Sequence, residues 1–259
     1  MSRLRDNHAC VQAMNYTAFQ LFLLALLLSP PMTALLAGNA MGGEGLTRGT
    51  TRVTGRISVA GRFSAPKALP VFKNRGFCGP QVVNETLMVG NHGGLKNAAV
   101  ILYALDQPVS AMPGRVILDN QNCAFAPHVQ VASIGSELAL KNSDPILHTV
   151  HARLGQETLF NVGLPHWRGV TKRLHRPGVV RIDCDVLHTW MSAAVVVTES
   201  PYFAVSDDSG NFVLDRLPVG RYRVEVWHEK LGVKSMLFSV TGDSVVSLDV
   251  VYAVTENLK

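Results

Sequence analysis

The stretch that carries Cys184, His188 and Met191 constrains this chain more than any other part of its sequence. It places a thiol, an imidazole and a thioether close together in one short segment. Thiolate and thioether ligands favour Cu(I), whereas imidazole suits both oxidation states of copper. The stretch therefore predicts three ligands of a single copper ion.

The flanking residues predict that this stretch is a loop between two neighbouring strands. Before it, Val180, Ile182 and Cys184 alternate with charged residues, so Cys184 should point into a core. After it, the valine-rich run 193–197 favours a second strand. A loop held by two strands is a stiff place to fix a metal ion.

A Cys, a His and a Met on the last loop of a Greek-key β-sandwich, with one His much earlier, resemble the copper site of the cupredoxins, the plastocyanin-like blue-copper proteins. The earlier histidine here is His148, in a segment similar to the one that carries the first ligand in plastocyanin-like proteins. The resemblance implies one type 1-like copper ion. His148, Cys184 and His188 would be its equatorial ligands and Met191 its weak axial ligand.

The spacing of the loop departs from that of the small electron carriers. Three residues separate Cys184 from His188 and two separate His188 from Met191, which resembles the second half of the binuclear site of cytochrome oxidase subunit II. That binuclear site needs a further Cys four residues earlier, where this chain has Val180. A mononuclear site is therefore expected.

The beginning of the chain has the features of a secretory signal. Basic residues precede an apolar run, Phe19 to Leu28, which is too short to span a bilayer and ends in small residues. We expect residues 1–40 to be a signal peptide cleaved after Ala40, and the protein to be periplasmic or secreted. An uncleaved membrane anchor is the alternative.

The four cysteines fit an exported, oxidising compartment. Cys10 would leave with the signal peptide, which leaves Cys78 and Cys123 free to pair as a disulfide. Cys184 is then the odd thiol, and a metal would account for it. An ordinary buried core cysteine is the alternative explanation of Cys184.

From Val53 onward the chain shows short alternating runs and turn residues without a helical period, which predicts an all-β protein. Residues 50–200 are expected to form a cupredoxin-like Greek-key sandwich, with its core at about 115–198. Residues 201–255 contain the patterns Asp-x-x-Gly-x-Phe and Leu-Pro-x-Gly-x-Tyr, which resemble the prealbumin-like carboxypeptidase regulatory-like domain. Exported proteins sometimes labelled methylamine utilization proteins combine the two modules.

The first strand typical of the regulatory-like domain lies far upstream, at Gly55 to Val59. Two architectures follow from this. The second, smaller sandwich either follows the copper domain or is completed by strands from 50–105, so that the two domains are interlocked. Pairing between the strand near Ile57 and the strand near Val224 would indicate insertion.

Three further histidines are weaker candidates for metal ligands or for residues that support the ligands. His151 should lie on the opposite face of the strand from His148. His128 follows Cys123 closely and is expected to be structural, whereas His228 lies in a Trp-His-Glu run and could cap the site or bond across the domain interface.

The formal net charge of +5 comes from scattered Lys and Arg, without a run that would follow a phosphate backbone. Nucleic-acid binding is therefore not expected, and no small-molecule substrate is implied. No Gly-x-Ser-x-Gly or His-Glu-x-x-His motif indicates a hydrolase.

These features predict a copper protein that transfers single electrons to a redox partner and is not an enzyme. Three alternatives remain open: a copper carrier or sensor, a metal-free structural or binding β-sandwich, and a copper oxidase or nitrite reductase with an additional copper site.

Overall fold

The computed structural model describes residues 51–64, 66–242 and 245–254. The predicted signal peptide, its cleavage site and Cys10 lie outside the described residues. The described chain is almost entirely β-structure, as predicted, with one short α-helix, α1 (Arg75–Cys78), and one 3-10 turn at Asn91–Gly93. Among these residues, no helix is both long enough and apolar enough to span a membrane.

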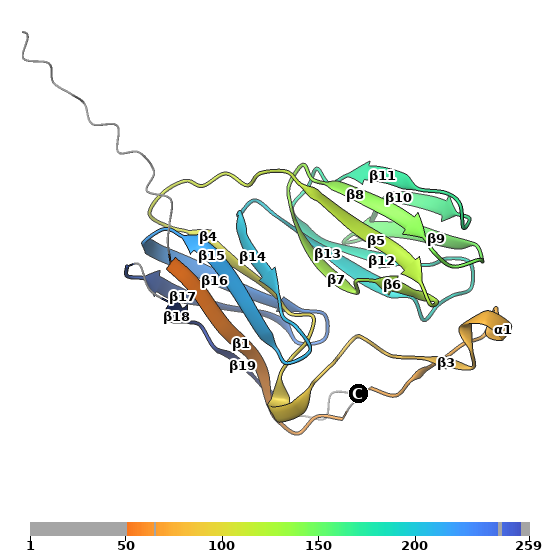
Figure 1. Ribbon diagram of the computed structural model, residues 1–259, viewed down its shortest axis with the longest axis horizontal. Helices are drawn as coiled ribbons and strands as arrows, with labels where there is room; N and C mark the ends of the chain where they lie inside the picture. The colour runs from red at the N-terminus through yellow and green to blue at the C-terminus, as the bar shows by residue number, and fades with distance from the viewer. Residues whose placement is uncertain (1–50, 65, 243–244, 255–259) are drawn as a thin grey trace, which may run out of the picture. The chain divides into compact units, whose positions relative to one another are not determined.

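Four sheets form two sandwiches (Figure 1). We call the one built from both ends of the described chain the flank sandwich. One of its sheets contains β1 (Thr51–Gly61), β15 (Asn211–Leu217), β18 (Val245–Ser247) and β19 (Val250–Val254). The other contains β4 (Ala99–Ala104), β14 (Tyr202–Val205), β16 (Gly220–His228) and β17 (Gly232–Val240).

The second, or central, sandwich is built from one continuous part of the chain. Its larger sheet has the order β10-β9-β12-β13-β7: β10 (Glu157–Leu164), β9 (His148–Leu154), β12 (Gly178–Asp183), β13 (Ser192–Thr198) and β7 (Val129–Ser133). Its smaller sheet has the order β11-β8-β5-β6: β11 (Val170–Arg173), β8 (Glu137–Asn142), β5 (Arg115–Gln121) and β6 (Ala124–Ala126). A separate hairpin pairs β2 (Leu69–Pro70) with β3 (Gln81–Val82).

Strand pairing in the flank sandwich joins segments from before and after the central sandwich. β1 pairs with β15, β18 and β19, and β4 pairs with β14 and β16. The specific pairing of Ile57 with Val224 does not occur. Ile57 lies on β1, whereas Val224 pairs with Leu102 in the facing sheet, so the two residues instead share the core between the sheets. The boundaries of the two domains stay a prediction.

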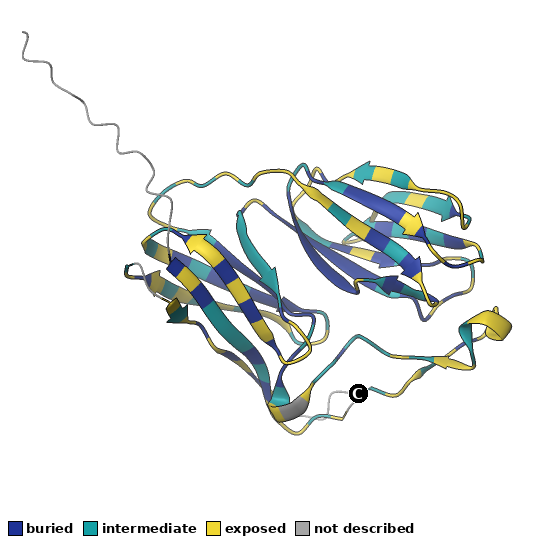
Figure 2. Ribbon diagram, viewed as in Figure 1, coloured by how far each residue is buried: buried dark blue, intermediate teal, exposed yellow. Residues whose placement is uncertain are grey.

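Each sandwich has its own apolar core, because alternate residues of the strands point inward. In the central sandwich, Val180 and Ile182 on β12 are buried, with Val195 on β13, as the alternation predicted. Figure 2 shows the same alternation of buried and exposed residues along many strands of both sandwiches.

β13 is buried on both faces, which explains its continuous apolar sequence. Val195 and Val197 point into the core of the central sandwich. Ala194 and Val196 belong instead to a third apolar cluster, together with Ile101 on β4 of the flank sandwich. The strand that ends the predicted ligand loop therefore packs between two cores, and this fixes its register.

The pattern Asp-x-x-Gly-x-Phe begins with a tight turn at Asp207–Asn211. The Asp207 carboxylate accepts the backbone N–H groups of Ser209 and Asn211, and Gly210 takes a φ of 81° that favours glycine. The Gly210 carbonyl accepts the N–H of Ile57 on β1. This turn therefore links the C-terminal segment to the first strand.

Leu102→Ala should destabilise the protein by roughly 2–5 kcal/mol, because Leu102 is fully buried and a cavity would remain. Its core contains residues from before the central sandwich and from the segment after residue 200, so the loss would report on the shared sandwich. Urea unfolding, followed by far-UV circular dichroism, measures the change.

The matched control is Leu237→Ala on β17, because this leucine is largely exposed. It should change stability by less than about 0.5 kcal/mol. Equal losses for the two variants would contradict the assignment of Leu102 to a shared core.

Candidate metal centre

The loop between β12 and β13 closes where Asp183 pairs with Ser192. Cys184 follows β12 directly, and its side chain continues the buried face of that strand. His188 lies in the middle of the loop, and the Met191 N–H donates to the His188 carbonyl at 2.9 Å. Leu187 takes a positive φ of 67° while largely exposed. Such a conformation is costly for a large side chain, so the surrounding contacts must hold the loop in place.

A separate turn positions His148 at the start of β9. The Asn142 amide donates to the carbonyls of Ile146 and Leu164 at 2.8 and 2.7 Å. The Asn142 side-chain oxygen accepts the N–H of Asp144 at 3.0 Å. This network fixes the short turn that brings His148 to the end of the sandwich.

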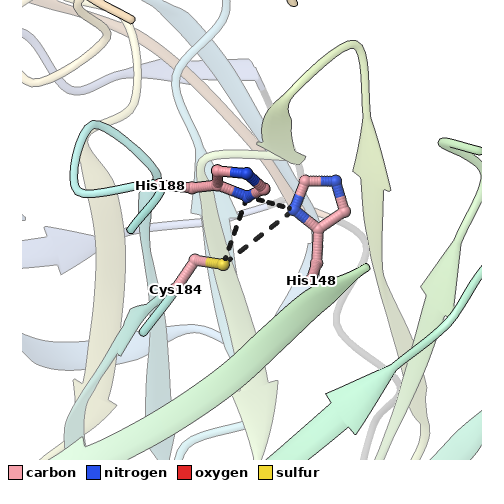
Figure 3. A group of neighbouring side chains, drawn as sticks. All are labelled: His148, Cys184 and His188. Atoms are coloured by element: carbon pink, nitrogen blue, oxygen red, sulfur yellow. Dashed lines mark hydrogen bonds between the residues drawn. The ribbon is translucent and has the colours of Figure 1, made fainter. Parts of the chain in front are cut away.

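The structure brings together His148, Cys184 and His188, whose donor atoms lie within 4.8 Å of one another (Figure 3). The two Nδ1 atoms are 3.0 Å apart. The sulfur of Cys184 is 3.9 Å from Nδ1 of His148 and 3.7 Å from Nδ1 of His188. All three residues are buried.

These separations fit a single metal ion among the three donors. Bonds of about 2.0–2.1 Å to imidazole nitrogen and about 2.3 Å to thiolate sulfur, as found for zinc, are compatible with the spacing of all three atoms. A thiolate with two imidazoles is also a donor set typical of copper electron-transfer sites. These three residues are therefore candidate ligands of one ion.

The outer nitrogen of each imidazole is already bonded to an oxygen of the protein. Nε2–H of His148 donates to the Asp144 carboxylate at 3.0 Å, and Nε2–H of His188 donates to the Asn74 side-chain oxygen at 2.9 Å. A neutral imidazole carries one N–H, so both Nδ1 atoms present lone pairs to the centre of the site. In this pair of tautomers two lone pairs face each other at 3.0 Å, an arrangement that a cation between them would stabilise.

Electrostatics keep these histidines neutral at physiological pH. Burial lowers the pKa of His148, although Asp144 acts in the opposite direction. Burial lowers the pKa of His188 to about 4, and the proximity of His148 and Lys73, which opposes a second positive charge there, acts in the same direction. Neutral imidazole is the form that binds metals, so protons would compete for this site only under acidic conditions.

The sulfur of Cys184 accepts hydrogen bonds from Thr149. The Thr149 N–H lies 3.3 Å from the sulfur and the Thr149 hydroxyl 3.7 Å. The same hydroxyl accepts the N–H of Asp185 at 2.7 Å. Donors at these positions stabilise negative charge on a thiolate, which is the form that binds a metal.

Met191 and Trp190 complete the buried end of the loop. Both pack in the core of the central sandwich. The Trp190 ring lies 5.0 Å from that of His188, and its Nε1–H donates to the carbonyl of Cys123 at 3.0 Å. Trp190 therefore shields one side of His188 from water. The role of Met191 as an axial ligand stays a prediction.

The three histidines that were weaker candidates, His151, His128 and His228, lie outside the cluster of donors. His151 contacts the carboxylate of Asp185 and the hydroxyl of Thr158 through its two ring nitrogens. His128 contacts the Ser192 carbonyl at 2.9 Å and the Glu229 carboxylate at 2.7 Å. His228 is buried, and its Nδ1 accepts the N–H of Lys230 at 3.2 Å.

A bond across the domain interface was one of two roles that the sequence suggested for His228. Between the sandwiches it is His128 that forms such a bond, with the Glu229 carboxylate. The predicted disulfide is present, with the sulfur atoms of Cys78 and Cys123 2.04 Å apart. Cys184 is the free cysteine of the described residues.

Sequence reasoning missed Asn74 as a site residue and gave Asp144 no role. Asp144 lies in the turn before His148 and could have been suspected from that position. Asn74 is 114 positions from His188, and nothing in its local sequence indicates the contact.

No protein-family model and no curated protein matches the sequence. Solved structures that match include a purple cupredoxin from Nitrosopumilus maritimus, with 20% identity, 33% of this chain and 99% of that chain covered, and a TM-score of 0.29. The copper-containing nitrite reductase of Thermus scotoductus has 19% identity and a TM-score of 0.30, and the match covers 38% of this chain and 25% of that chain. A reduced amicyanin variant has 17% identity and a TM-score of 0.30, and the match covers 38% of this chain and 99% of that chain.

At these TM-scores the matches do not by themselves assign a fold or a function. They cover no more than about two fifths of this chain.

The pH dependence of stability should reflect His228. Burial lowers the pKa of His228 to about 4, although the nearby Glu229 carboxylate acts to raise it. As pH falls below 6.5, the unfolded chain binds a proton that the folded protein excludes until about pH 4. The metal-free protein should therefore lose stability across this window, with roughly 3 kcal/mol from His228 alone. In His228→Gln, urea unfolding at pH 7 and pH 4.5 should show a smaller loss. Identical losses in the two proteins would contradict the assignment.

Proposed function

We propose that this chain is an exported cupredoxin-like protein that binds one copper ion and transfers single electrons. The observation that carries the proposal is the convergence of two imidazole lone pairs and one cysteine sulfur. His148, Cys184 and His188 would hold the ion, with Met191 as a weak fourth ligand. Copper, when bound, supplies a one-electron redox couple.

The residues of the site suit electron transfer because hydrogen bonds to other parts of the protein hold the candidate ligands in position. Asp144 and Asn74 hold the outer nitrogens of the two imidazoles, and the Thr149 donors hold the sulfur. Ligands fixed in this way need little rearrangement when one electron is gained or lost. Cys184 would provide the strongest electronic coupling to the ion.

Burial of the donors favours electron transfer over copper carriage. A carrier must hand over its ion, so its ligands should be accessible, whereas all three donor residues here are buried. Three spare donors would help a carrier. His151 and His128 have both ring nitrogens bonded to other protein atoms, and His228 is buried. We propose a carrier of electrons and not an enzyme, because a catalytic copper would need a second set of donors besides the one that the described residues bring together.

The remaining parts of the proposal come from the sequence. Residues 1–40 would direct export to the periplasm or outside the cell. The flank sandwich would be the regulatory-like domain, because the turn patterns that resemble that domain lie in it. With a net charge of +5, the protein would be attracted to an acidic redox partner.

The first test is the optical spectrum after one equivalent of Cu(II). The mature protein should develop a strong visible thiolate-to-copper band, and Cys184→Ser should lack it. The matched control, His151→Ala, should keep the band because His151 lies outside the donor cluster. Absence of copper binding in the wild-type protein would contradict the proposal.

A second test separates electron transfer from copper carriage. Repeated chemical reduction and reoxidation should bleach and restore the visible band without loss of amplitude. The same cycles in the presence of excess Cu(I) chelator should remove copper only slowly, because the ligands are buried. Complete extraction during the first reduction would favour carriage instead.

A further inference from the structure

The hairpin Leu69–Val82, which we call the strap, contributes to the metal centre from outside both sandwiches. It contains β2, α1 and β3, and lies on an arm that continues from the end of β1 (Figure 1). Val71 is buried against the core of the central sandwich. Leu69, Cys78 and Val82 also pack against this core, whereas residues 72–77 at the tip are exposed. Two specific bonds join the strap to the surroundings of the site.

The first of these bonds joins the strap to a candidate ligand. Asn74 precedes α1 in the left-handed conformation, with φ 57° and ψ 31°. Its side-chain oxygen accepts Nε2–H of His188 at 2.9 Å. Asn74 is exposed and His188 is buried. A single amide on the strap thus lies between the outer edge of this imidazole and solvent.

The second bond is the disulfide between Cys78 on the strap and Cys123. Asn122 and Cys123 form the two-residue turn between β5 and β6, and both have positive φ, of 54° and 58°. Glycine is favoured at the second position of such a turn. A cysteine is conformationally unfavourable there, and the disulfide that it forms accounts for its presence.

The same turn supports the other histidine. The N–H groups of Asn122 and Cys123 donate to the two oxygens of the Asp144 carboxylate, at 2.7 and 2.8 Å. The Asp144 carboxylate accepts Nε2–H of His148 at 3.0 Å. The carbonyl of Cys123 also accepts the Nε1–H of Trp190. Cys123 therefore contacts the groups that hold both sides of the site.

We propose that the disulfide-tied strap is a structural part of the metal centre, with Asn74 as the positioning residue for His188. One disulfide connects the support of His188, through the strap, with the support of His148, through Asp144. Asn74 holds Nε2 of His188 in its protonated form and directs the Nδ1 lone pair inward. The strap also covers the imidazole edge and so slows the release of an ion. The statement on ion release rests on the proposed copper function, whereas the statement on the imidazole does not.

The decisive variants are Asn74→Gly and Asn74→Asp. Glycine takes a positive φ without cost but removes the acceptor, whereas aspartate tolerates this conformation and keeps an acceptor oxygen. The two variants therefore separate the hydrogen bond from the backbone conformation. Arg75→Ala, an exposed neighbour on α1, is the matched control for changes to the strap surface.

The first readout needs no metal. Long-range ¹H–¹⁵N NMR of the metal-free protein reports which imidazole nitrogen of His188 carries the proton. The wild-type protein, Asn74→Asp and Arg75→Ala should show protonated Nε2. Asn74→Gly should show a mixture of the two tautomers. Protonated Nε2 in Asn74→Gly as well would overturn the positioning role, whatever the protein binds.

The second readout is the rate at which the copper-loaded protein loses copper to excess chelator. Asn74→Gly should release copper about 10- to 100-fold faster, the range typical when a residue that supports a metal ligand is lost. Asn74→Asp should restore the wild-type rate. The double variant Cys78→Ala/Cys123→Ala should resemble Asn74→Gly. It removes the covalent bond between the strap and the turn that joins β5 to β6, and it changes no candidate ligand.

The outcomes distinguish the two proposals. A wild-type protein that binds no copper, but whose His188 tautomer depends on Asn74, would reject the copper function and keep the positioning role. Copper binding with equal release rates in all the variants would keep the copper function and reject the strap as part of the centre.

Discussion

The arrangement of this structure depends on two imidazoles whose lone pairs face each other 3.0 Å apart. Without a cation this contact is unfavourable, and the protein maintains it by bonding the outer nitrogens to Asp144 and Asn74. Each imidazole is thus held from the side opposite the site. Packing and hydrogen bonds elsewhere must compensate for the unfavourable free energy of this contact. A metal ion bound between the two nitrogens would attract both of them.

The two sandwiches provide the rigidity that this contact requires. β13 is buried on both faces, so a shift by one residue would exchange the side chains that it contributes to the two cores. The loop 184–191 is closed by the pairing of β12 with β13, so their register also fixes where Cys184 and His188 lie. The hydrogen bonds of His128 to the Ser192 carbonyl and to the Glu229 carboxylate then join the end of this loop to the flank sandwich. Packing far from the site therefore contributes to its geometry.

Much of this could be predicted from the sequence because it depends on local pattern. Alternation at Val180 and Ile182 placed Cys184 in the core. The chemistry of the loop selected His188, and the resemblance to the cupredoxins selected His148, which the structure brings next to both. The partners of the imidazoles depend on contacts between distant segments, and periodicity carries no information on these. Asn74 reaches His188 from a strap that the disulfide and the burial of Val71 hold against the central sandwich. The local pattern likewise gave no sign that Ile57 and Val224 lie in facing sheets and share one core.

On the proposed function, the buried position of the donors has different consequences for electrons and for ions. An ion leaves only after its bonds break and the strap or loop moves, whereas an electron needs only a short separation from its partner. The outer edge of His188 is separated from solvent by the amide of Asn74, which is itself exposed. This thin cover would hold back water and chelating groups and still leave the imidazole near the surface. A site closed in this way is suited to repeated electron transfer and poorly suited to delivering its metal.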